Sequence, residues 1–196
     1  MGSGSARLGL APWLGVASSV ALSAVLLLAS VAYVAAFEGQ AGALRAMSWA
    51  GVAAPALHIV GLSLLAAASY LLERRAGASG AFKYALAAAI VYVALNIGLT
   101  VVFGLAMYAA APSLTSGETP EVVAAYVTGI IMSFLIMMVY RRIAAAAPPV
   151  AAARLRRAGK LYFEGAILSV VLFGFALALT GQAYAAVAFA SMYRSR

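Results

Sequence analysis

Residues 82–111 read FKYALAAAIVYVALNIGLTVVFGLAMYAAA, an apolar run whose one charged residue, Lys83, stands at its start. As an α-helix that rises ~1.5 Å per residue, this run is about 45 Å long. That length exceeds the roughly 30 Å hydrocarbon core of a bilayer. The run is typical of a membrane-spanning helix, and we expect it to tilt, kink or protrude from the membrane.

The composition extends this interpretation to the whole chain. Of its 196 residues, 66% are hydrophobic and 9% are charged, with a mean hydropathy of +1.03, whereas soluble domains carry about 25% charged residues. In lipid, only helices and closed barrels satisfy every backbone hydrogen bond, and barrel strands would alternate strictly between apolar and polar residues. The apolar runs here are unbroken. We therefore predict an all-α fold, a polytopic transmembrane helical bundle of five to six membrane segments with a C-terminal helical hairpin.

The expected segments belong to a single integral membrane domain over residues 1–196. A loop is expected at residues 38–47, and Thr119-Pro120-Glu121 predicts a helix start, since a hydroxyl cap precedes a proline and an acid. The last apolar stretch, residues 161–193, is too long for one span, and we place a break at Gly181. The approximate spans are 12–37, 48–72, 82–111, 120–140, 161–179 and 183–193.

Basic residues gather on one side of this threading, in short loops beside the apolar spans. Arg45 is the exception among the 13 Lys and Arg residues. Because loops rich in Lys and Arg stay in the cytoplasm, we predict a multi-pass protein of the cell membrane with both termini cytoplasmic. The net charge of +8 favours anionic lipid headgroups over nucleic acid, since no basic domain projects from the membrane. The expected headgroup contacts are Arg141, Arg142, Arg154, Arg156, Arg157 and Lys160.

The single histidine, His58, falls within the second span, toward the outer leaflet. Ionisable groups inside a membrane usually mark function, so His58 is a candidate haem ligand, quinone partner or proton-relay group. A bis-histidine haem would need a second histidine, and one of the seven methionines would have to replace it. The plainer alternative is a neutral imidazole that is hydrogen-bonded to a neighbouring helix. No other cofactor is expected.

Other polar residues within the spans are candidates for intramembrane sites. Glu164 follows Lys160 by one helical turn, which indicates an interfacial ion pair or, alternatively, a proton-coupled carboxylate. Asn96 and Thr100 could form a polar notch for a solute, or bonds between helices. Gln182, beside the expected break, could complete a re-entrant site or cap exposed backbone.

Small residues one turn apart let helices approach closely, either within the chain or against another subunit. Such pairs are Ser19 with Ser23, Ala85 with Ala89, and Gly174 with Ala178.

Residues that carry catalysis or bind metals are scarce. The chain has no cysteine, no aspartate and one histidine, so thiol chemistry and most hydrolytic mechanisms lack their residues. We expect neither an enzyme nor a metal site. A shortage of thermolabile side chains is typical of thermophile proteins, although an alanine-rich chain from a GC-rich genome shows the same composition.

Two stretches carry a family resemblance. One runs from IVGL at 59–62 to SYL at 69–71 and, after a charged turn, to Phe82; the other is KLYFEGAIL at 160–168 with FAS at 189–191. Together they resemble an archaeal family of small multi-spanning membrane proteins catalogued as a domain of unknown function. The resemblance covers about half of the chain. It implies an archaeal source and a multi-helix bundle with a C-terminal hairpin, and it transfers no activity and no functional residue.

These features favour a non-catalytic helical scaffold or accessory subunit of a larger membrane complex, such as a respiratory one. Its partners would be membrane lipids and other membrane subunits or further copies of the chain. One alternative is a small-solute transporter or channel that uses His58, Asn96, Thr100 and the break at Gly181, because discontinuous helices often form such sites. A second alternative is a redox subunit that binds haem or quinone at His58.

Overall fold

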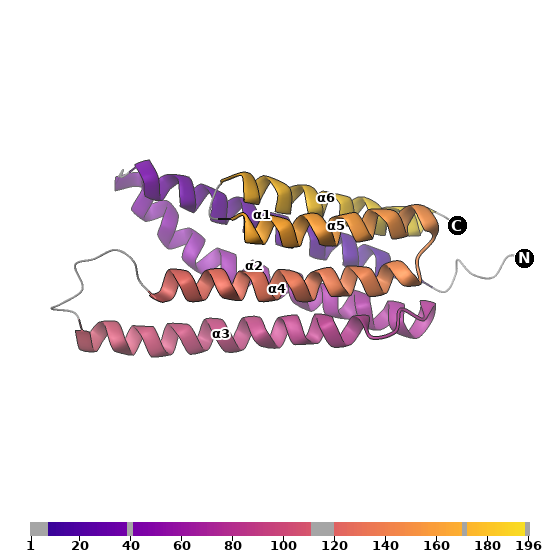
Figure 1. Cartoon of the computed structure of the whole chain (residues 1–196), viewed down its shortest axis with the longest axis horizontal. Helices are drawn as coiled ribbons and strands as arrows, with labels where there is room; N and C mark the ends of the chain where they lie inside the picture. The colour runs from indigo at the N-terminus through magenta and orange to yellow at the C-terminus, as the bar shows by residue number, and fades with distance from the viewer. Residues whose placement is uncertain (1–7, 39–40, 111–119, 170–171, 195–196) are drawn as a thin grey trace, which may run out of the picture.

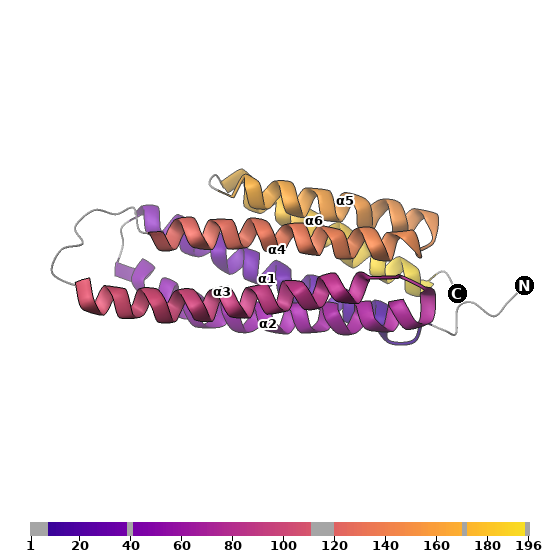
Figure 2. The same cartoon turned by 60° about the horizontal axis from the view of Figure 1, so that its bottom comes forward.

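The computed structural model describes the backbone of residues 8–38, 41–110, 120–169 and 172–194, and the side chains of residues 8–31, 34, 53–95, 126–169 and 173–193. These parts of the chain form six α-helices and no strand: α1 (Ala11–Glu38), α2 (Ala41–Ala76), α3 (Ala81–Ala110), α4 (Pro120–Ala145), α5 (Pro149–Ile167) and α6 (Leu172–Arg194). The helices lie along one common long axis (Figures 1 and 2). The predicted all-α helical bundle is confirmed.

The helices close into a ring. Each packs against the helix before and after it in the chain, and α6 returns to pack against α1. Small residues make the crossings close: a Cβ added to Gly15 of α1 would lie 2.5 Å from the Phe189 ring of α6. Between α1 and α2, the hydroxyl of Ser18 donates to the carbonyl oxygen of Gly61 at 2.8 Å. The buried side chains of the ring are mostly alanine and leucine, with Tyr140 the largest that is fully buried.

Several helices carry stretches that can cross a bilayer. In the described residues four are long and apolar enough: Ala11–Val31 of α1, Ala53–Ala76 of α2, Tyr126–Ala145 of α4 and Phe173–Tyr193 of α6. The third helix, α3, continues unbroken to Ala110 as expected. Large apolar side chains such as Val20, Ile90 and Val187 are exposed on the outside of the ring. An apolar outer surface around apolar helices is what lipid as the solvent requires.

Two of the expected loops are helical. Residues 41–47, expected within the 38–47 loop, form the first turns of α2, because Ala, Leu, Met and Arg are among the strongest helix formers. The basic stretch from Arg154 to Lys160 lies within α5 and not in a loop. Pro149 starts α5 at a position where the N–H that proline lacks would have no helical partner in any case.

The C-terminal hairpin is present, but the break expected at Gly181 is wrong. The last helix, α6, runs without interruption through Gly181, and α5 ends at Ile167. Thus α5 and α6 replace the expected spans 161–179 and 183–193. A Cβ on Gly181 would lie 2.8 Å from the carbonyl oxygen of Ala158 and 2.9 Å from the nitrogen of Tyr162. Gly181 is therefore the point where α6 presses against the backbone of α5.

The turn between α2 and α3 lies at the end of the bundle where α1 begins and α6 ends (Figure 1). Gly77 and Gly80 carry the chain around it with φ of +72° and +79°, values that side chains with a Cβ rarely adopt. The carboxylate of Glu73 accepts a hydrogen bond from the backbone N–H of Phe82 at 3.1 Å. This carboxylate caps α3, because the first N–H groups of a helix lack partners within it.

We call this end of the bundle the basic end. The α4–α5 turn lies there too, and the rings of Trp13 and Tyr193 meet there with centroids 5.4 Å apart. The described cations at the helix ends that meet here are Arg74, Arg75, Lys83, Arg141 and Arg142. Their gathering at one end agrees with the expected threading. That the basic end faces the cytoplasm stays a prediction.

Candidate functional site: a cavity inside the helix ring

A partly open cavity of about 410 Å³ lies between the helices of the ring and is lined by residues of all the helices described. Its volume is within the range usual for small-molecule sites, about 300–1,000 Å³. Apolar side chains dominate its wall. Polar or aromatic groups in the wall include His58 of α2, Tyr92 of α3, Thr128 and Ser133 of α4, Tyr162 and Ser169 near the end of α5, and Phe175 of α6.

His58 is the wall residue with an unused polar atom. Its ring stacks on the ring of Tyr92, with centroids 4.2 Å apart and an interplanar angle of 29°. Its Nε2 atom is buried and has no hydrogen-bond partner among the residues described. The hydrogen bond to a neighbouring helix that the plainer alternative expected is therefore absent at Nε2. A buried polar atom without a partner costs about 1–3 kcal/mol, a cost that a suitable ligand atom would remove.

The serine hydroxyls in the wall already donate hydrogen bonds to backbone carbonyl oxygens. Ser133 donates to the carbonyl oxygen of Ile130 at 2.9 Å, and Ser169 donates to that of Ala166 at 2.8 Å. A hydroxyl that already donates its proton in this way can only accept a hydrogen bond from a ligand. The wall thus offers acceptor oxygens from serine, together with one imidazole nitrogen that accepts or donates according to its tautomer.

The local sequence explains why a space remains here. Gly129 lines the cavity, and a Cβ built on it would meet no atom within 4 Å. Pro55 lies inside α2, one turn before His58, and proline in a helix interior bends the helix because it removes a hydrogen bond and crowds the preceding turn. On the other side, Gly165 and Gly174 draw α5 and α6 together beside the cavity.

The other candidate residues do not join His58. Gln182 is fully buried in α6 away from the cavity wall, and its Oε1 accepts a hydrogen bond from the hydroxyl of Tyr140 at 3.0 Å. It caps no helix end, because α6 is continuous there. Asn96 and Thr100 lie on α3, and their side chains fall outside the described residues. Glu164 lies on the outside of the ring.

The expected pair of Glu164 with Lys160 is confirmed. Lys160 Nζ lies 3.6 Å from Glu164 Oε1, and the two side chains are 42% (Glu164) and 70% (Lys160) exposed. The expected small-residue packing is confirmed for Gly174 and Ala178, since both lie against Gly165 of α5. The hydroxyls of Ser19 and Ser23 bond to the carbonyl oxygens one turn earlier, at 3.0 and 2.8 Å.

The cations expected at lipid headgroups fall on α4 and α5. Arg141 and Arg142 are exposed in the last turns of α4, and Arg154, Arg156, Arg157 and Lys160 follow in α5. Two of the guanidinium groups lie over tyrosine rings: Arg142 over Tyr84 at 5.8 Å and Arg157 over Tyr184 at 4.9 Å from the ring centroids. Such contacts fix the direction of a cation without neutralising it. Contact with headgroups stays a prediction.

Sequence reasoning missed the other residues of the cavity wall. Tyr92, which stacks on His58, lies one turn before Asn96 on α3, and Thr128, Ser133 and Tyr162 are scattered over two other helices. Hydroxyls inside apolar runs are visible in the sequence. Which of them line the same cavity as His58 depends on how the ring closes, and no local pattern encodes that arrangement.

No family model, curated protein or solved structure matches this chain. The resemblance to an archaeal membrane family therefore stays a prediction.

Proposed function

We propose that this membrane protein binds a small, mainly apolar molecule inside the helix ring, and that His58 holds the one polar group of that molecule. The observation that carries this proposal is the buried Nε2 of His58, which lines a cavity of about 410 Å³ without a hydrogen-bond partner among the described residues. The ligand enters from the lipid phase, where apolar molecules concentrate. Its polar group is a carbonyl or a hydroxyl, since either can pair with an imidazole nitrogen.

A quinone is the ligand class that fits these features best. Its ring is flat and apolar, which suits a wall of apolar and aromatic side chains. Its oxygen is a carbonyl in the oxidised form and a hydroxyl in the reduced form, so one of the two tautomers of His58 can pair with each form. Tyr92 supports this role because its ring, stacked on the imidazole, limits the directions in which Nε2 can point.

The transporter alternative loses one of its supports, the helix break at Gly181, because α6 is continuous through this residue. Its other residues were His58, Asn96 and Thr100, and the side chains of Asn96 and Thr100 lie outside the described residues. This alternative stays a prediction. The accessory-subunit hypothesis is compatible with ligand binding, because a subunit of a larger complex can hold such a molecule without carrying out catalysis. It stays a prediction.

A short-chain benzoquinone tests the proposal with purified protein in lipid nanodiscs. Ligand that binds only the folded state raises the unfolding temperature, and above the Kd the rise continues with the logarithm of ligand concentration. We expect this concentration-dependent rise for the wild type, and its onset gives the apparent Kd. In His58→Phe the apparent Kd should increase on the order of fivefold, since one hydrogen bond contributes about 1 kcal/mol.

The matched control is Ile59→Phe, which adds the same ring at the next position of α2, on the exposed side. It should bind the benzoquinone with the affinity of the wild type. The proposal is wrong if the unfolding temperature of the wild type does not rise with benzoquinone concentration, or if His58→Phe and Ile59→Phe bind equally well.

A further inference from the structure

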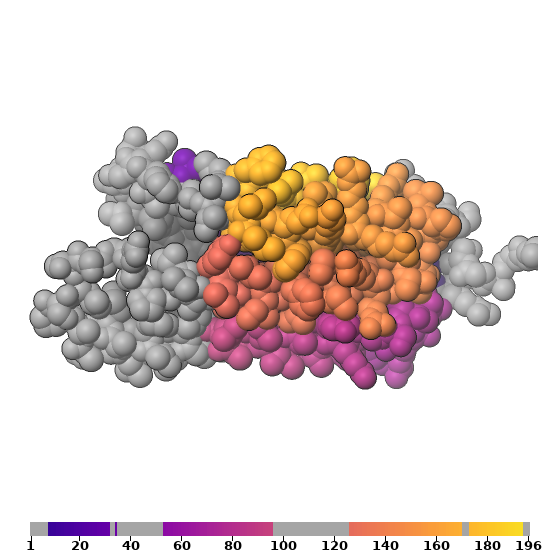
Figure 3. All heavy atoms as spheres, in the orientation of Figure 1, coloured from indigo at the N-terminus to yellow at the C-terminus, as the bar shows by residue number. Residues whose placement is uncertain are grey.

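The outward face of α5 carries charges in an otherwise apolar surface. We define the α5 face as Arg156, Arg157, Lys160 and Glu164. The two arginines precede Lys160 by four and three residues and Glu164 follows it by four, so all of them lie on the same side of the helix as Lys160. The opposite side of α5 packs into the ring through residues such as Leu155 and Tyr162. Figure 3 shows side chains of α5 on the outer surface of the molecule, next to those of α4.

The inner part of the α5 face lies beside apolar stretches of two neighbouring helices. In α6, Gly181 lies against Ala158 and Tyr162, and it is about 12 residues, or roughly 18 Å of helix, from the end of the apolar stretch at Tyr193. In α4, the ring of Phe134, which lies seven residues before Arg141, has its centroid 5.9 Å from that of Phe163.

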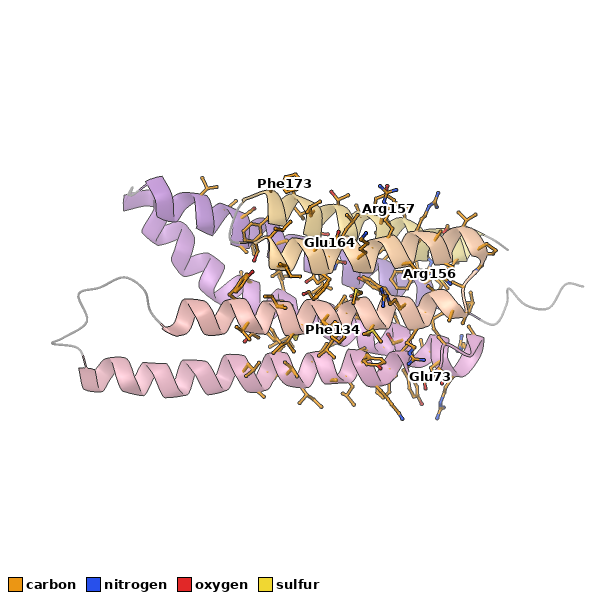
Figure 4. The ribbon with its side chains drawn as sticks, viewed as in Figure 1. Glu73, Phe134, Arg156, Arg157, Glu164 and Phe173 are labelled. Atoms are coloured by element: carbon orange, nitrogen blue, oxygen red, sulfur yellow. The ribbon has the colours of Figure 1, made fainter. Side chains whose placement is uncertain are left out.

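Figure 4 shows the same arrangement. Glu164 lies at about the level of Phe134 along the bundle, whereas Arg156 and Arg157 lie nearer the basic end. Both neighbouring helices therefore place Glu164 beside apolar stretches on the outside of the ring, and the contact with α6 places Lys160 there as well.

A charged side chain in contact with lipid hydrocarbon is unfavourable. Lys160 can extend its long chain toward the basic end, since helical side chains point toward the helix N-terminus. Glu164 has a shorter chain and points to Lys160, which is its partner at 3.6 Å. Charged residues within membranes face protein or water, so something other than lipid covers this face.

We infer that the α5 face is covered by the α5 face of a second copy of this chain. The part beside these apolar stretches holds one cation and one anion, so a partner helix that carried only carboxylates would place a like charge against Glu164. In two copies related by a two-fold axis along the membrane normal, the two α5 helices run parallel, and each supplies the opposite charge for the other. Lys160 of one copy pairs with the partner's Glu164, and Glu164 with the partner's Lys160. Arg156 and Arg157 lie nearer the basic end than this pair.

The chain has no cysteine, so a single introduced cysteine reports on this contact directly. Ile167 is exposed two helical turns from Lys160, on the same side of α5. In membranes treated with a mild oxidant, Ile167→Cys should form a disulfide-linked dimer. Ile90→Cys, which is exposed on α3 (58% against 40% for Ile167), should stay monomeric. No dimer for Ile167→Cys, or equal dimer for both variants, overturns the inference.

Charge reversal separates pairing between copies from pairing within one helix. Lys160→Glu and Glu164→Lys each destroy the internal pair and place like charges across the two-fold contact. Each variant alone should lose dimer on the order of tenfold or more. When the two variants are co-expressed with different tags, the mixed dimer regains both pairs and should be recovered at the level of the wild type. Recovery no better than that of either variant alone would contradict the exchange of Lys160 and Glu164 between copies.

Discussion

Glycine residues decide how closely α5 and α6 approach each other. A Cβ on Gly165 would lie 2.6 Å from the nitrogen of Ala178 and 2.6 Å from the carbonyl oxygen of Gly174. Both are backbone atoms of α6, which cannot rotate away as a side chain can. Any larger residue at Gly165 must therefore push the two helices apart beside the cavity.

We predict that Gly165→Ala lowers the free energy of unfolding by about 1–3 kcal/mol, the usual cost of overpacking. The matched control is Gly129→Ala on α4, where the new Cβ meets no atom within 4 Å. In that variant the free energy of unfolding should rise by up to about 1 kcal/mol, because alanine is a better helix former than glycine. Thermal unfolding in detergent compares the two. An unchanged Tm for Gly165→Ala would show that the crossing is looser than described.

The site is predictable from the sequence in part. His58 stands out because it is the single histidine and lies inside an apolar run. Its stacking partner does not stand out, because the contact with Tyr92 depends on how α2 and α3 align. The unpartnered state of Nε2 is likewise a property of the closed ring and not of any local pattern.

At the scale of elements, long helices were the easiest feature to predict and breaks were the hardest. The length of α3 follows from its apolar run alone. The turn after α5 begins at Leu168 and Ser169, where neither a glycine nor a proline indicates the end of a helix. Thr180-Gly181-Gln182 does carry such a signal, yet it lies within a helix, because its glycine serves packing and its glutamine bonds to Tyr140. The sequence around a glycine does not show whether the glycine breaks a helix or lets two helices pack closely.

Two turns at the basic end test the threading of the helices. Ser79 lies in the α2–α3 turn and Ala147 in the α4–α5 turn. We predict that Ser79→Cys and Ala147→Cys both react with a membrane-impermeant maleimide in inverted vesicles and not in intact cells. Leu65→Cys, buried in α2, is the control that should not react in either preparation. Labelling of the two turns from opposite sides would refute the threading.

The whole molecule combines a closed ring, an internal cavity and one charged outer face. Ring closure through α1 and α6 brings residues far apart in the sequence together in the wall of the partly open cavity. The charged face lies on α5, outside the ring. Ligand binding and pairing of copies therefore use different surfaces. A substitution in the cavity wall should leave the dimer intact, and a substitution on the α5 face should leave ligand binding intact.

The central claim is that the cavity holds an apolar molecule in the native membrane. Its most direct test is mass spectrometry of the organic extract of protein purified from its own membranes, with Gly129→Leu to fill the cavity and Ile131→Phe as an exposed control on the same helix. We expect the wild type and Ile131→Phe to yield one carbonyl- or hydroxyl-bearing compound in near-stoichiometric amount, and Gly129→Leu to yield several-fold less. Equal amounts from all three proteins, or no such compound from the wild type, would contradict the claim.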